Sequence, residues 1–280
     1  MDKTLSFYRG KAVFITGASS GIGEELAWQL AQAGAKLTLA ARRKDKLENL
    51  AQKIAAHGAA TPLATPCVLA CDVAREGDLQ FAVAESVRHW GKLEVVFANA
   101  GFGVVGPFKN LSLEDYRRQF ETNVFGVLRT VYAALPELEK SRGNLALIGS
   151  VSGWVATPGN APYAMSKFAV RALANSITAE LRRAGVKLTL ISPGFVVSDI
   201  RRVDNQGLLH AHAADPVPRW IQMPTPQAAR QILQAVARGK REQIITLHGK
   251  LFVALERFFP WLNRLLSRRM SPVYESRSSL

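Results

Sequence analysis

A glycine-rich turn near the start of the chain constrains its fold more than any other stretch. An apolar run over residues 12–16 is followed by Gly17-Ala18-Ser19-Ser20-Gly21-Ile22-Gly23 and then by a helical pattern with apolar residues on one side. This order predicts a strand, a turn and a helix. Glycines in such a turn let a pyrophosphate approach the backbone amides at the positive end of the helix. We therefore expect this turn to bind phosphate, although its spacing differs from GxGxxG and a simple turn is the alternative.

Strand-like and helical segments alternate along the rest of the chain. This alternation predicts an α/β fold, namely a Rossmann-type, doubly wound parallel sheet with right-handed crossovers and helices on both faces. The expected strands after the first are residues 36–41, 67–71, 93–98, 145–149, 186–191 and 243–247. The expected helices after the first are residues 44–57, 76–90, 112–134, 162–184 and 226–238.

Two arginines follow the second expected strand. The strand ends at Ala41, and Arg42 and Arg43 stand where an acidic side chain would accept the ribose hydroxyls of NAD. Guanidinium groups pair instead with a 2′-phosphate, so the pattern favours NADP(H), with NAD(H) as the second possible cofactor. The alternative is an ordinary helix that begins with basic residues. Cations are unfavourable at a helix N-terminus, however, and a nearby anion would explain why they occur there.

Tyr163 and Lys167 form the pair with the clearest chemical meaning. Their spacing of four residues places both on one face of a helix, where the ammonium of Lys167 would favour the ionised form of the Tyr163 phenol. Tyr163 would then move a proton at neutral pH as a general acid. Ser150, at the end of the run 145–149, would hydrogen-bond the oxygen that Tyr163 protonates. For the pair alone, an aromatic core contact beside a solvated lysine is the alternative.

Three further local patterns lead to expectations. Asn123 lies within the helix expected at 112–134, where it is either a satisfied core amide or the cause of a bend that frees a carbonyl for an ordered water. Residues 199–224 are irregular and contain three prolines, which predicts a lid beside the cofactor site. Thr225 and Pro226 predict the N-cap and first turn of the next helix.

Composition argues against several classes of protein. The formal net charge of +14 would suit nucleic acid or an anionic membrane, but the basic residues are scattered and accompany no nucleic-acid-binding signature. We therefore expect no nucleic-acid partner. The five histidines and the two cysteines, Cys67 and Cys71, lack ligand spacing, so we expect no metal and reduced, buried thiols. The first residues carry no secretory apolar region and no run reaches about 18 apolar residues, so we expect a cytoplasmic location.

Taken together, these motifs occur in the order and spacing of one enzyme family. The sequence resembles the ordinary branch of the short-chain dehydrogenase/reductases over roughly residues 8–248. The motifs that carry the resemblance are the glycine turn, Asn99-Ala100-Gly101, Asn123, Ser150, Tyr163 with Lys167, and Pro193-Gly194. The resemblance implies one domain with a seven-stranded parallel sheet in the order 3-2-1-4-5-6-7, assembled as a homodimer or homotetramer.

The resemblance also implies a role for each matching position. Tyr163 is then the general acid in carbonyl reduction, and Lys167 binds the nicotinamide ribose and eases proton transfer. Ser150 orients the substrate oxygen, and Asn123 holds the water of a proton relay. The implied contacts to the diphosphate and adenosine ribose are Gly17, Ser19, Ser20, Gly21, Ile22 and Gly23. Besides Tyr163 and Lys167, the resemblance implies Arg42 as a contact to the 2′-phosphate, with Arg43 as a second one, and Asp72 and Val73 as contacts to the adenine. At the nicotinamide half the implied contacts are Asn99, Ala100 and Gly101. The carboxamide would be held by Pro193, Gly194, Val196 and Ser198.

Two positions depart mildly from the family pattern, and the C-terminus extends beyond it. Ala98 stands where the family commonly has Asn, and Ser198 replaces a common Thr but keeps the hydroxyl. Residues 249–280 follow the shared domain, residues 1–248, and begin with a wide apolar stripe interspersed with arginines, in which Pro260 predicts a kink. Such a basic amphipathic helix would contact a membrane through residues 249–270. The alternative is a helix that covers the substrate cleft or a neighbouring subunit.

An apolar helix beside the cleft suggests an apolar substrate, and the run 37–47 resembles 3-ketosphinganine reductases. We therefore expect an NADP(H)-dependent oxidoreductase that reduces a hydrophobic or lipid-like ketone or aldehyde to an alcohol, in the cytoplasm or at the membrane periphery. Two other hypotheses are a non-catalytic NADP-binding regulator, which would usually lack the Tyr or the Lys, and a membrane-peripheral interaction protein.

Overall fold

The computed structural model describes residues 4–57, 64–206, 208, 210, 215, 217–262 and 265. In this part of the chain a seven-stranded sheet runs in the order β3-β2-β1-β4-β5-β6-β7, and every neighbouring pair is parallel. The expected fold class is confirmed. The strands are β1 Ala12–Thr16, β2 Lys36–Ala41, β3 Cys67–Ala70, β4 Val95–Ala98, β5 Asn144–Ile148, β6 Lys187–Ser192 and β7 Glu242–Ile244.

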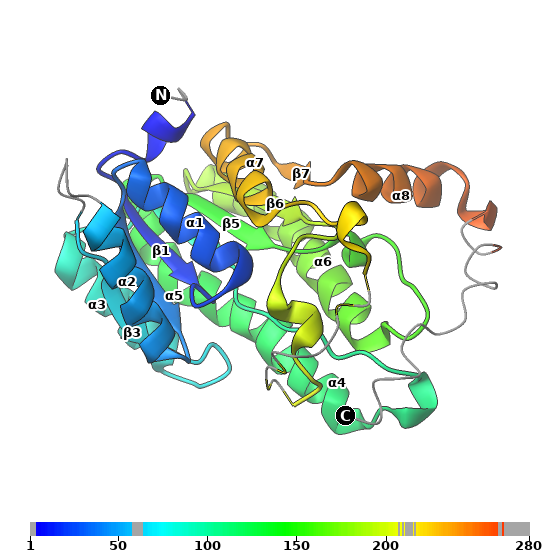
Figure 1. The fold of residues 1–280 in the computed structure, drawn as a ribbon. Helices are drawn as coiled ribbons and strands as arrows, with labels where there is room; N and C mark the ends of the chain where they lie inside the picture. Colours follow the sequence, from blue (N-terminus) through cyan, green and yellow to red (C-terminus); the bar gives the residue numbers. More distant parts are fainter. Residues whose placement is uncertain are drawn as a thin grey trace.

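Helices cover both faces of the sheet (Figure 1). Val13 and Ile15 of β1 pack in one core with α1, α2 and α7, whereas Phe14 between them packs in the other core with α3, α5 and α6. This alternation is the period of a strand that is buried on both faces. The helices are α1 Gly21–Gln32, α2 Lys44–His57, α3 Asp78–Trp90, α4 Leu113–Phe120, α5 Gly126–Ser141, α6 Ala161–Arg183, α7 Thr225–Ala237 and α8 Leu247–Phe258. The short 3-10 helices are η1 Leu5–Tyr8, η2 Phe108–Asn110, η4 Val151–Gly153, η5 Asp199–Arg202 and η6 Arg219–Ile221.

The helix expected at 112–134 is three segments. A π-helical turn, η3 Glu121–Phe125, separates α4 from α5, and α5 continues to Ser141. Asn123 lies inside this turn, so the sequence located the irregularity but not its form. A π turn widens the backbone hydrogen-bonding pattern by one residue and is frequent at functional sites.

Two boundaries near the C-terminus were wrongly predicted. The last strand ends at Ile244 rather than at residue 247, because the Thr246 side chain accepts a hydrogen bond from the Gly249 amide and so caps α8. Thr225 does not cap α7 but is its first residue. Its hydroxyl donates to the Val197 carbonyl, which ties the start of α7 to the loop after β6.

The C-terminal helix α8 follows β7, at the opposite end of the molecule from β3 (Figure 1). Its Gly249 and Val253 are buried, and Gly249 packs so closely that an added Cβ would lie 2.7 Å from a Val151 methyl carbon. No helix in the described part of the chain combines the length and apolar composition needed to cross a bilayer. The tail beyond residue 265 and several residues of the expected lid lie outside the described residues.

Candidate active site

The glycine turn joins β1 to α1 and is held by the end of β4. Gly17 and Gly21 have φ of 66° and 57°, in the left-handed region that favours glycine. The Asn99 side-chain amide donates to the carbonyls of Thr16 and Gly17, at 3.0 and 3.2 Å. A Cβ at Gly23 would lie 2.3 Å from the Gly17 oxygen, so only glycine fits there. The sequence therefore places glycine where the backbone requires it.

The N-terminus of α1 and one arginine give this turn the chemistry of a diphosphate site. Ser20 is the N-cap residue, but its side chain makes no capping bond to the helix. Arg43 instead donates from Nη2 to the Ser19 and Ser20 hydroxyls, at 3.1 and 2.9 Å. Arg42 is exposed, and Ile22 packs against the core below the turn. Open first-turn amides and a guanidinium suit an anionic dinucleotide.

The loop after β4 lies between the glycine turn and α6. The Thr16 hydroxyl accepts hydrogen bonds from the amides of Asn99 and Ala100, at 3.0 and 3.1 Å. A Cβ added to Gly101 would lie 3.0 Å from Asn123 Oδ1 and 3.7 Å from Lys167 Nζ. These contacts bring the predicted Asn99-Ala100-Gly101 segment against the predicted catalytic residues.

Asn123 is fully buried and hydrogen-bonded on both sides of its amide. Its Oδ1 accepts from the Phe102 amide at 3.1 Å, and its Nδ2 donates to the Phe102 carbonyl at 3.0 Å and to Ser166 Oγ at 3.2 Å. Gln119 also donates to the Phe102 carbonyl, at 2.9 Å. The amide is therefore satisfied within a π-helical turn, and a carbonyl freed for an ordered water stays a prediction.

Tyr163 lies in the first turn of α6, one turn before Lys167. Lys167 is 5% exposed, and its Nζ donates to the Ile148 carbonyl at the end of β5, at 2.9 Å. The same Nζ lies 5.6 Å from the centre of the Tyr163 ring. The Tyr163 ring packs beside Gly103, where an added Cβ would lie 3.6 Å from the ring. Burial lowers the pKa of Lys167 from 10.5 to about 8, so the ammonium still predominates at neutral pH.

Ser150 follows β5 directly and begins η4. Its Oγ accepts a hydrogen bond from the Ser152 amide at 3.0 Å, and a hydroxyl that accepts in this way keeps its proton for donation. Close packing joins η4 to α6, since a Cβ at Gly153 would lie 2.7 Å from the Lys167 carbonyl oxygen. The end of β5 thus positions Ser150 next to the helix that carries Tyr163.

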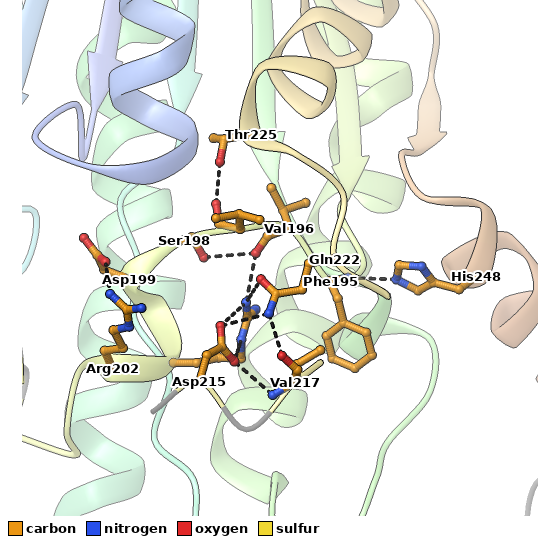
Figure 2. A network of polar contacts seen from close by, with 12 residues as sticks. Phe195, Val196, Ser198, Asp199, Arg202, Asp215, Val217, Gln222, Thr225 and His248 are labelled. Carbon is orange, nitrogen blue, oxygen red and sulfur yellow. Dashed lines mark hydrogen bonds and ion pairs between the residues drawn. The ribbon is translucent and has the colours of Figure 1, made fainter. Parts of the chain in front are cut away.

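The loop after β6, residues 193–198, is the last segment of the candidate site, and Figure 2 shows its polar contacts with neighbouring segments. The Pro193 carbonyl accepts from the Val151 amide at 2.8 Å, and Ser198 lies against the glycine turn, 3.4 Å from a Cβ added to Gly21. The Val196 carbonyl accepts from Arg201 Nη2 at 3.1 Å.

A polar network holds the expected lid segment against this loop. Arg201 forms a two-bond ion pair with Asp215, with both N–O distances at 2.7 Å. It also donates to Gln222 Oε1 at 2.8 Å. The side chains of the ion pair are only 14% and 16% exposed, which favours its persistence in solution.

Asp72 and Val73 lie where β3 ends, beside the end of β2. The Cys71 amide donates to the Ala41 carbonyl at 3.0 Å, which aligns the two strand ends. Asp72 Oδ1 accepts from the Ala74 amide at 3.0 Å. Val73 is buried. Both residues are thus held at the strand edge that also presents the glycine turn.

Several residues of the site carried no recognised sequence signal. Thr16 supports the loop after β4, and its position as a polar residue at the end of an apolar run was the available clue. Gln119 and Ser166 support Asn123. The helical spacing of Gln119 from Asn123, and of Ser166 from Tyr163, could have suggested that they belong to the site. Arg201 and His248 hold the loop after β6 from segments whose conformation the sequence did not determine.

No group of three or more His, Cys, Asp or Glu side chains able to hold a metal occurs among the described residues. The polar groups of the site are instead an uncapped helix terminus, hydroxyls, one buried ammonium and arginines. This set suits an organic anion and a proton transfer.

A model of the family described as short chain dehydrogenase matches residues 11–208. The chain belongs to the short-chain dehydrogenase family. It is therefore an oxidoreductase, and the predicted family resemblance is confirmed. The dehydrogenase/reductase SDR family protein 7-like of Dictyostelium discoideum is 30% identical over 272 residues, which cover 96% of this chain and 84% of that protein.

Two solved structures share the architecture. An alcohol dehydrogenase from Thermococcus sibiricus, solved with 5-hydroxy-NADP, is 26% identical with a TM-score of 0.70 and covers 84% of this chain and 95% of its own. A short-chain dehydrogenase/reductase from Burkholderia phymatum, solved with NAD, has a TM-score of 0.80 and covers 95% of this chain and 97% of its own. At 24% identity, the second likeness concerns the fold alone.

The burial of Lys167 predicts a pH dependence of stability. Between pH 8 and 10.5 the unfolded chain binds a proton that the folded chain has released, because burial lowers the pKa of Lys167 from 10.5 to about 8. The free energy of unfolding of the wild type should therefore rise with pH relative to Lys167→Met, by at most about 3 kcal/mol. Urea unfolding of both proteins from pH 7 to 10.5 measures the difference, and a difference independent of pH would contradict the assignment.

Proposed function

We propose that this oxidoreductase reduces a hydrophobic ketone or aldehyde to an alcohol, with NADP(H) as the preferred cofactor and Tyr163 as the general acid. The observation that carries the proposal is the position of Tyr163 one turn before the buried Lys167 ammonium, beside the loop after β4 and the strand end that presents Ser150. These elements lie at the carboxyl ends of the parallel strands, where open α/β sheets bind ligands.

The residues of the chain divide the chemistry among themselves. A bound nicotinamide cofactor supplies the hydride. Tyr163 gives its phenolic proton to the carbonyl oxygen of the substrate, and Ser150 donates a hydrogen bond to the same oxygen. Lys167 holds a positive charge near the Tyr163 ring and has two N–H bonds beyond the one that reaches Ile148. Asn123 fixes the π turn, whose backbone would hold the water that returns a proton to Tyr163.

The apolar surface beside the cleft supports a hydrophobic substrate. Phe195 of the loop after β6 is 36% exposed, and its ring stacks on His248 of α8. His248 in turn contacts Phe252, which is also exposed. An aromatic strip thus leads from the loop at the active site onto α8. Burial of apolar surface would stabilise an apolar substrate more than a polar one there.

The two remaining hypotheses differ in their support. The hypothesis of a regulator without turnover has no support, because all four predicted catalytic residues are present in a connected arrangement, namely Tyr163, Lys167, Ser150 and Asn123. Assembly as a homodimer or homotetramer stays a prediction of the family resemblance. A membrane-peripheral role is compatible with catalysis and depends on the outer face of α8.

The outer face of α8 is apolar and exposed. Leu247, Leu251 and Phe258 are 81%, 66% and 66% exposed, whereas Lys250 and Arg257 lie exposed along one flank. We infer that this face contacts an anionic membrane, because its basic flank and the net charge of +14 complement anionic headgroups. A helix that covered the cleft or its own protein with this stripe would have buried the three apolar residues.

Replacement of the proton donor tests the mechanism. Tyr163→Phe should lower kcat for carbonyl reduction by roughly 100-fold or more, because only the acidic hydroxyl is lost. Binding of NADPH, followed by fluorescence, should remain nearly unchanged. Tyr132→Phe is the matched control, since Tyr132 is exposed on α5 and its hydroxyl lies outside the site. A Tyr163→Phe enzyme with most of its activity would refute the proposed role.

The two arginines after β2 can be distinguished by cofactor affinity. Arg43→Ala should raise the Kd for NADPH by roughly tenfold to 100-fold and leave the Kd for NADH almost unchanged, because a charge-assisted contact to the 2′-phosphate is lost. Arg42→Ala is the comparison and should have the smaller effect, since Arg43 already lies on Ser19 and Ser20. Equal losses for both cofactors would show that Arg43 only stabilises the turn.

Vesicle binding tests the outer face of α8. The wild type should sediment with vesicles of phosphatidylcholine and phosphatidylserine, and less so at high salt. Leu251→Glu with Phe258→Glu should abolish sedimentation, whereas Phe81→Glu, an exposed phenylalanine on α3, should not. If the double variant instead changes only the molecular mass in solution, the face binds a second copy. Failure of the wild type to sediment would overturn the membrane assignment.

A further inference from the structure

His248 links the C-terminal helix α8 to the loop after β6 (Figure 2). Its Nε2 accepts a hydrogen bond from the Phe195 amide at 2.9 Å. Its ring stacks on the Phe195 ring, with centroids 5.4 Å apart and planes 23° apart. One side chain thus contacts both the backbone and the side chain of the same loop residue.

The loop approaches the start of α8 too closely for any side chain at Gly194. A Cβ there would lie 2.1 Å from Thr246 Oγ1 and 2.6 Å from His248 Nε2. Thr246 is itself buried and caps α8 by accepting from the Gly249 amide. The backbone of residues 194–195 therefore lies directly against the capped first turn of α8.

The hydrogen bond requires one protonation state of the imidazole. Nε2 accepts only if it carries no proton, so the ring is neutral with its proton on Nδ1. Burial lowers the pKa of His248, which keeps the ring neutral at physiological pH. The ring neighbours Phe195 and Phe252 are uncharged, so the acceptor state does not depend on a neighbouring ion.

We propose that His248 is a positioning residue that holds the loop 193–198 in its cofactor-binding conformation, which makes α8 a structural part of the cofactor site. This inference rests on the proposed function, in which that loop contacts the nicotinamide carboxamide. Two side chains bind its backbone from different segments, and the Met223 backbone also pairs with Phe195 and Val197. His248 holds the Phe195 amide, and Arg201 of the lid segment holds the Val196 carbonyl.

Arg201 and His248 connect the loop to different segments of the protein. Arg201 is itself tied to Asp215 and Gln222, so its bond to Val196 connects the loop to the lid. His248 connects the same loop to the C-terminal helix. Removal of the His248 bond leaves the loop attached through Arg201 and Met223, so the fold should persist, while the Phe195 amide loses its partner and the order of the loop decreases.

Two substitutions separate the hydrogen bond from the ring contact. His248→Phe keeps an aromatic ring to stack on Phe195 but has no acceptor. His248→Gln has no ring but places an amide oxygen near the position of Nε2. If the bond is what positions the loop, His248→Phe should raise the Kd for NADPH by roughly threefold to tenfold, as expected for one hydrogen bond. His248→Gln should restore most of the affinity.

The experiment measures two quantities on the full-length proteins. Fluorescence titration gives the Kd for NADPH and NADH, and amide hydrogen exchange without cofactor gives the protection of the Phe195 amide. We expect faster exchange of this amide in His248→Phe and nearly wild-type exchange in His248→Gln. Equal affinity and equal protection in His248→Phe and the wild type would overturn the proposal.

The remaining outcomes are also decisive. Equal weakening in both variants would show that the stacked ring, and not the hydrogen bond, matters, which overturns the proposed role of Nε2. If the wild type bound neither NADPH nor NADH, the proposed function would fail and the role of His248 in cofactor binding would fail with it. If the Phe195 amide lost its protection while the affinity for NADPH stayed unchanged, the proposed role of this loop contact in cofactor binding would be refuted.

Discussion

The buried ammonium of Lys167 is the interaction on which the candidate site depends. An ammonium can be withdrawn from water only when its hydrogen bonds are replaced, and here the Ile148 carbonyl at the end of β5 replaces one. This bond ties α6 to the end of β5 on the face that carries Tyr163, one helical turn before Lys167. The close contact of Gly153 with the Lys167 backbone then brings the start of η4, and with it Ser150, to the same place. The depressed pKa of Lys167 is the consequence of this burial.

The loop after β6 has the opposite character, since it belongs to no regular element and depends on its neighbours. The Pro193 carbonyl is bound by the Val151 amide, the Val196 carbonyl by Arg201, and the Phe195 amide by His248. These three anchors come from η4, from the lid segment and from α8. The loop is therefore connected to η4, to the expected lid segment and to α8, whereas Lys167 is bound by the strand end at Ile148.

Sequence patterns predicted the parts of the structure that local chemistry determines. The glycine turn was located because Gly17, Gly21 and Gly23 are each required by the backbone. The irregularity at Asn123 was located because an amide in an apolar helix needs partners, but its partners, Phe102 and Ser166, are distant in sequence and could not be read from it. The strand order followed from the family resemblance, whereas the alternation of elements predicted only the class.

Contacts between distant segments explain what the sequence did not predict. The end of β7 was placed too late because Thr246 caps a helix, and an apolar run alone does not distinguish a strand from a helix start. The contacts of Arg42 and Arg43 depend on the conformation of the bend between β2 and α2, in which both residues lie. The spacing of Arg42 and Arg43 therefore could not show which of them contacts Ser19 and Ser20.

The helix α8 combines two surfaces whose separation has a physical consequence. Its inner side, with Gly249 and Val253, packs on the protein, and His248 reaches the loop after β6, while its outer side exposes Leu251 and Phe258. His248 thus connects the helix that carries this outer face to the Phe195 amide. A membrane that binds the outer face would therefore contact the same helix that holds the proposed cofactor loop. The access of an apolar substrate from the membrane and the order of the loop after β6 would then both depend on α8.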